Sequence, residues 1–178
     1  MSAASEQLIE RAAQARKENR PADAKQDLTE AIALLRQDEP GPELAQALRL
    51  LGKVERKLHD HAAARQHYEE AVSIYRTCGD APTLAHTIRH LGDVHHDAGR
   101  RELAEPCYSE ALNLYRGNPE ASALDVANAV RSMAVLKAET GEGDQALLLW
   151  EEARDLYSGL NVTAGVTECD KRLARLKA

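Results

Sequence analysis

Four positions recur along the chain at nearly constant spacing, and this repeat restricts the fold more than any other feature of the sequence. Each recurrence has a small residue, a large residue four positions later, a small residue three further on, and a large one after another four. The four sets are Ala24, Leu28, Ala31 and Leu35; Ala64, Tyr68, Ala71 and Tyr75; Ala104, Tyr108, Ala111 and Tyr115; and Ala146, Trp150, Ala153 and Tyr157. Successive sets are 40, 40 and 42 residues apart. Because such positions share one face of an α-helix, the pattern predicts four equivalent helices that pack closely on their neighbours.

A second helix is predicted before each of the last three, because its residues recur with the same spacing. Leu48, Leu51 and Gly52 match Ile88, Leu91 and Gly92, and then Val130, Met133 and Ala134. Between the paired helices, Asn19, His59, Gly99 and Gly141 occupy equivalent places. Gly and Asn tolerate the left-handed conformation that ends a helix. His59 fits this role poorly, so we expect its turn to differ.

This arrangement resembles the tetratricopeptide repeat over residues 5 to 158. The resemblance rests on the Leu-Gly pairs at 51–52 and 91–92, on Gly99 and Gly141, and on the Ala-x3-Tyr-x2-Ala run of the second helix. The segment 104–112 is similar to the longer repeats of kinesin light chains. The usual repeat has 34 residues and ends its second helix with Pro. Here Arg36, Arg76, Arg116 and Ser158 stand at that place, so longer helices are expected.

The predicted fold is an all-α, right-handed superhelix that forms a single domain over residues 1–178. Its repeats span about 4–38, 42–79, 81–117 and 119–159, with Asn118–Pro119 opening the first helix of the last repeat. A capping helix at 162–177 is expected to cover that repeat. Leu147 and Leu148 replace Arg65 and Gln66 of the second repeat and Glu105 and Pro106 of the third, which should be exposed. They predict either contact with the capping helix or a dimer interface, and hence a monomer or a weak homodimer.

Composition and motifs argue against several classes of function. A net charge of -6 disfavours a general nucleic-acid binder, and the chain has no run of 18 apolar residues that could span a membrane. Its three cysteines are widely spaced, which favours the reducing cytoplasm and offers no zinc motif. The GxSxG, P-loop, HExxH and GxGxxG motifs are absent. We therefore expect neither an enzyme nor a bound cofactor.

The resemblance implies that the first helix of each pair lines a concave groove. The residues that it places there are Arg49, Lys53, Arg56, Lys57, His86, Arg89, Asp93, His96, Asn128 and Arg131. Arg16 and Lys17 take the matching place in the weaker first repeat. The N-terminal half of this groove is basic, and arginine forks suit carboxylates, so the hypothesis is a scaffold for an acidic or C-terminal peptide. In the alternative interpretation, the arginines pair with glutamates of adjacent helices or are solvated.

Two other functions remain open at this stage. One is a regulatory or sensory module that binds a small molecule or a signalling peptide, and the other is a homo-oligomeric assembly module. The pair His86 and His90, with Asp93 and Asp97 beyond it, has spacing that could hold a metal, but no third strong ligand is fixed, so none is predicted. Protonation of these histidines near pH 6 is expected to make the groove more positive.

Overall fold

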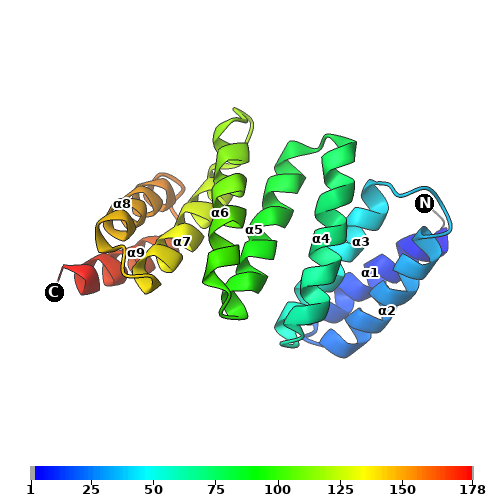
Figure 1. Cartoon of the computed structure of the whole chain (residues 1–178). Coiled ribbons are helices and arrows are strands. Elements are labelled where there is room, and N and C mark those ends of the chain that lie inside the picture. The colour runs from blue at the N-terminus through cyan, green and yellow to red at the C-terminus, as the bar shows by residue number, and fades with distance from the viewer. Residues whose placement is uncertain (1–2, 178) are drawn as a thin grey trace.

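The computed structural model describes residues 3–177, and every regular element in that range is a helix. The helices are α1 (Ala3–Lys17), α2 (Pro21–Leu35), α3 (Pro42–Lys57), α4 (His61–Cys78), α5 (Ala81–Asp97), α6 (Arg101–Arg116), α7 (Ala123–Glu139), α8 (Gly143–Gly159) and α9 (Thr163–Leu176). Figure 1 shows them as successive hairpins in a row, with the two termini at opposite ends. The predicted all-α superhelix of helix hairpins is confirmed.

Small residues let the two helices of each hairpin approach closely. Gly52 on α3 faces the ring of Tyr68 on α4, and an added Cβ atom would lie 2.9 Å from that ring. Gly92 faces Tyr108 in the same way, with 2.7 Å for the added atom. Both tyrosines are buried. A larger side chain than hydrogen would therefore have to displace a core ring, which explains the repeated Leu-Gly pair.

The turn inside each hairpin has one residue in the left-handed conformation. The φ angles are 58° at Asn19, 60° at His59, 73° at Gly99 and 84° at Gly141. The expectation that the turn at His59 differs was therefore wrong. Histidine is among the non-glycine residues found more often in this region, so the hairpin geometry overrides its modest cost.

The connection between the third and fourth repeats departs from the sequence-based prediction. Helix α7 begins at Ala123, and Asn118–Pro119 lies in the preceding loop. There the side-chain Oδ1 of Asn118 accepts a hydrogen bond of 3.0 Å from the backbone N–H of Glu120. The local bond makes a turn of its own, so the loop takes up the two inserted residues without disturbing either helix.

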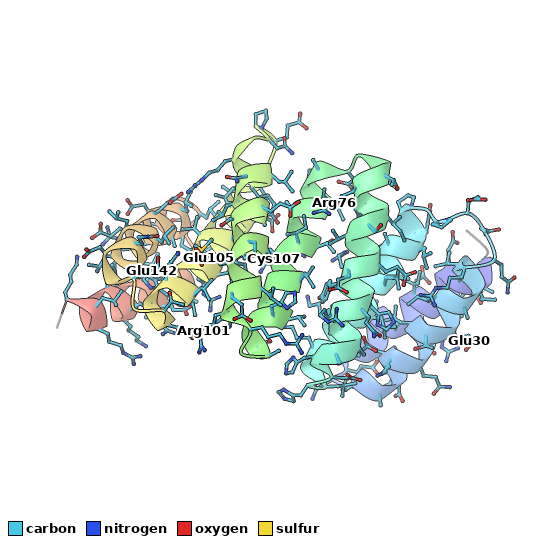
Figure 2. All side chains as sticks on the ribbon, in the orientation of Figure 1. Glu30, Arg76, Arg101, Glu105, Cys107 and Glu142 are labelled. Carbon is cyan, nitrogen blue, oxygen red and sulfur yellow. The ribbon has the colours of Figure 1, made fainter. Side chains whose placement is uncertain are left out.

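Equivalent ion pairs join each second helix to the second helix of the next repeat. Arg36 lies 2.6 Å from Glu70, Arg76 lies 2.7 Å from Glu110, and Arg116 lies 2.7 Å from Glu152. Figure 2 labels Arg76 on the face where these helices lie. The arginines stand where the usual repeat has proline, so the C-terminal end of one second helix is tied to the middle of the next.

Helix α9 packs on the last repeat. Its Cys169 and Leu173 are buried, and Gly165 approaches the ring of Tyr157 so closely that an added Cβ atom would lie 2.5 Å away. Leu147 is partly buried against the same core, whereas Leu148 is 68% exposed. The capping helix therefore does not cover Leu148. No helix in residues 3–177 combines the length and apolar character needed to cross a membrane.

Candidate functional site

A hollow of about 970 Å³ opens between α1, α3 and α5, beside the turns that follow α1 and α3. We call it the N-terminal groove. Its charged lining consists of Arg16, Lys17, Lys53, Arg56, Lys57 and Asp97, and it also contains His59, His61 and His90. Five of these six charged residues are basic, although the whole chain carries a net charge of -6. The volume lies at the upper end of the range for ligand sites.

Several of these basic residues lack an acidic partner. Within residues 3–177, no carboxylate lies within 4.0 Å of the charged atoms of Arg16, Lys17, Lys53 or Lys57. Lys57 instead donates a 2.6 Å hydrogen bond to the side-chain oxygen of Asn19. Partial burial, followed by the charges of Arg16 and Arg49, lowers the pKa of Lys53. The groove thus concentrates positive charge that the protein itself does not neutralise.

Arg56 differs from its basic neighbours because two aspartates of α5 hold it. Its Nε atom lies 2.5 Å from Asp97 Oδ2, and its Nη1 atom lies 3.2 Å from Asp93 Oδ2. This contact joins the second repeat to the third and fixes the direction of the guanidinium. Arg56 therefore shapes the groove wall and contributes little free charge to it.

Asp93 is the centre of a buried polar network at the edge of the groove. It accepts hydrogen bonds of 3.0 Å from the Tyr108 hydroxyl and 3.0 Å from His90 Nδ1, and Arg89 Nη1 lies 3.3 Å away. Burial alone would raise the pKa of Asp93, but the His90 hydrogen bond and the charges of Arg89 and Arg56 lower it to about 2. Asp93 is therefore an ionised structural group that orients its neighbours.

The three equivalent arginines have different surroundings. Arg131 Nε lies 2.7 Å from Glu168 of α9, so the alternative interpretation of pairing across helices applies to it. Arg89 pairs with Asp93 of its own helix. Arg49 has no carboxylate within ion-pair distance in residues 3–177, and its buried Nε atom has no hydrogen-bond partner. Only Arg49 of the three keeps an uncompensated charge.

His86 and His90 contact each other next to this network. Their Nε2 atoms are 3.1 Å apart, and His86 Nδ1 lies 3.6 Å from Asp125. Burial, reinforced by the neighbouring positive charges, lowers the pKa of His86 to about 3, and burial also lowers the pKa of His90. The expectation that this pair gains charge near pH 6 was therefore wrong. The described part of the chain has no group of three His, Cys, Asp or Glu side chains arranged to hold a metal.

The remaining predicted residues lie farther along the array and are occupied by contacts within the protein. His96 Nε2 lies 3.0 Å from Glu139, and Asn128 Oδ1 accepts a 2.8 Å hydrogen bond from the Tyr157 hydroxyl. Sequence reasoning missed Asn19 and His59, which come from the turns, and His61, which is the first residue of α4. Their places in or next to the turns gave no indication that they reach the groove.

Comparison with known proteins identifies the same repeats. The model of the tetratricopeptide repeat family matches residues 4–77 and 83–159. BtubC from P. vanneervenii has a similar structure, with a TM-score of 0.73 and 20% identity over 97% of this chain and 79% of that one. Kinesin light chain repeats from Podosopora anserina have a TM-score of 0.74 and 12% identity, over 100% of this chain and 98% of that one.

A third similar structure belongs to a Rap protein complexed with Competence and Sporulation Factor. Its TM-score is 0.81 and its identity 15%, over 93% of this chain and 46% of that one. At these identities the likeness concerns the fold. No curated protein sequence matches the chain. The family model covers most of the sequence, and the structure consists of the successive helix pairs that such repeats form. The chain therefore belongs to the tetratricopeptide repeat family.

Proposed function

We propose that the protein is a noncatalytic, cytoplasmic scaffold whose N-terminal groove binds an acidic peptide segment of a partner protein. One observation carries this proposal. Arg16, Lys17, Lys53 and Arg49 gather in or beside a hollow of ligand size, and no carboxylate of residues 3–177 pairs with them. Like charges held together weaken a fold, so their presence indicates a ligand that neutralises them.

The architecture supports a binding role. Stacked helix pairs that contact mainly their neighbours form an extended concave surface, which suits a peptide or a loop of a partner. A Rap protein of this fold is complexed with Competence and Sporulation Factor, which is consistent with a ligand held by such an array. The same groove could also serve a regulatory module that responds to a signalling peptide.

The groove chemistry also supports the absence of catalysis. Among residues 3–177, Asp97 is the only carboxylate that lines the groove, and Arg56 holds it at 2.5 Å, so it is poorly placed to accept a proton from a substrate. The remaining charged groups of the lining are arginines and lysines. Such a set can bind and orient an anion, but it provides no activated nucleophile.

The experiment compares Arg16→Gln/Lys53→Gln with Lys171→Gln/Arg175→Gln. Both double variants remove two positive charges, but the second pair lies on the exposed side of α9. A fluorescent, end-blocked peptide rich in Glu is titrated by anisotropy at low salt. We expect the groove variant to bind about tenfold more weakly, since two charge contacts are lost. Equal affinities of parent and groove variant would contradict the proposal.

Self-association is a second candidate because of one exposed side chain. Leu148 is 68% exposed, and it borders a second hollow of about 480 Å³ together with Leu112, Met133 and Leu149. A second copy of the chain could cover the exposed Leu148 side chain. We expect Leu148→Ser to lower any dimer fraction seen by sedimentation velocity. A parent protein that stays monomeric up to high concentration would exclude this candidate.

A further inference from the structure

The unpaired cations of α3 form a row along one side of that helix. Arg49, Lys53 and Lys57 are spaced i, i+4 and i+8, so they follow each other on neighbouring turns. The rise of a helix places successive members about 6 Å apart and makes the row about 12 Å long. The negative end of the helix dipole accounts for Lys57, but Arg49 and Lys53 lie before the last turn.

The surrounding charges define the direction in which an acidic segment can lie. Arg16 and Lys17 of α1 flank the row on one side and add to its positive charge. On the other side, α5 presents Asp97, which is held by Arg56, and the buried Asp93, which is held by Arg56 and Arg89. An acidic peptide that crossed from α1 to α5 would therefore leave the unpaired cations and meet charges that are already paired with one another. A peptide that follows α3 stays beside basic residues throughout.

The spacing of the row matches an extended chain. In an extended peptide, alternate side chains point to the same side and are about 6.7 Å apart. Three such side chains span nearly the same length as the three cations. Resting on the proposed function, we infer that the groove is selective for an extended segment with acidic residues at every second position, the central one facing Lys53. A segment with wider acidic spacing can place only one carboxylate on the row at a time.

Two peptides of identical composition test this selectivity. Ac-GEGEGEG-NH2 has the alternating pattern, whereas Ac-EGGEGGE-NH2 has the same residues and charge with acids three apart. The blocked ends remove terminal charges. We expect the alternating peptide to bind about fivefold more tightly in calorimetry or competition anisotropy, because two more exposed charge contacts form.

Lys53→Gln should abolish that preference, and Lys171→Gln, which removes one charge from the exposed side of α9, should preserve it. Circular dichroism verifies that both variants keep the helical fold. If both peptides bind the parent with equal affinity, the spacing rule is wrong while the acidic-peptide function stands. If neither peptide binds, the proposed function and the spacing rule both fail.

Discussion

Ala111 is completely buried between the helices of the third repeat, and it represents the small residues that set the helix spacing. Replacement by Leu adds three carbon atoms to a site without free space. We expect Ala111→Leu to lower the free energy of unfolding by roughly 1–3 kcal/mol through overpacking. Urea denaturation measures the change, with Ala62→Leu on the exposed side of α4 as the control. Full tolerance of Leu at 111 would contradict the close helix contact.

His86 makes the stability depend on pH. In the unfolded chain it takes up a proton near its ordinary pKa of 6.5, whereas the folded protein holds the pKa at about 3. Between these values the unfolded state binds more protons, so stability falls as the pH is lowered from 6.5 towards 3. His86→Gln should make this fall shallower by up to about 1.4 kcal/mol per pH unit. Chemical denaturation at pH 7, 5.5 and 4.5 gives the slopes, and identical slopes in parent and variant would refute a partly buried His86 that stays neutral in the folded protein.

At the scale of helices, equivalent interfaces carry ion pairs in which the acidic and basic residues have exchanged helices. Lys25 of α2 lies 3.2 Å from Glu55 of α3, whereas Glu105 of α6 lies 2.5 Å from Lys137 of α7. Lys137 also contacts Glu142 at 2.7 Å, and Figure 2 labels Glu105 on α6 and Glu142 before α8. The reversal means that one repeat cannot replace another at these interfaces without bringing like charges together.

A charge swap tests this interface. Lys137→Glu brings three carboxylates together, and we expect it to cost roughly 1–2 kcal/mol because the acids remain partly solvated. Adding Glu105→Lys should recover most of that loss. The exposed pair Arg76 and Glu110 provides a comparison, since Arg76→Glu should cost less than about 1 kcal/mol. Failure of the second substitution to restore stability would mean that the ion pair does not hold α6 and α7 together.

Helix α9 covers Trp150, the single tryptophan of the chain. Trp150 has no exposed surface, and the Arg172 guanidinium lies 5.6 Å from the centre of its ring. We expect Leu173→Ala to cost about 2–3 kcal/mol by leaving a cavity under α9, and to shift tryptophan emission to longer wavelength as the helix loosens. Lys171→Ala on the outer side is the control. An unchanged spectrum and stability would show that α9 does not depend on this contact.

The helix faces could be predicted from sequence because burial repeats with a fixed period. Ala64, Ala104 and Ala146 have no exposed surface, as the pattern required. The Asp93 network could not be predicted, because its partners come from three helices and their contacts depend on side-chain conformations. For the same reason, the sequence predicted one groove-lining role for Arg49, Arg89 and Arg131, which occupy equivalent positions. In the structure Arg89 and Arg131 each pair with a carboxylate, and Arg49 does not.

Across the whole molecule, each helix contacts mainly the helices next to it in sequence, with smaller contacts between α3 and α5 and between α5 and α7. Stability in such an array is close to a sum over repeats and the interfaces between them. The two ends also differ in charge, because the N-terminal groove keeps unpaired basic residues while Arg131 of α7 is paired with Glu168 of α9. Binding of an acidic ligand should therefore protect the first two repeats more than the last.

A destabilised first repeat should accordingly open without unfolding the rest. Leu28 of α2 has no exposed surface, and Leu28→Ala should cost roughly 2–5 kcal/mol locally. Hydrogen exchange followed by mass spectrometry should show faster exchange in α1, α2 and α3, whereas α7 and α8 keep the exchange rates of the parent. Trp150→Ala is the matching change in the last repeat. It should speed exchange in α7 and α8 and leave α1, α2 and α3 at the exchange rates of the parent. A uniform increase along all helices in either variant would mean that the repeats unfold together, and that the interfaces between them outweigh the repeats themselves.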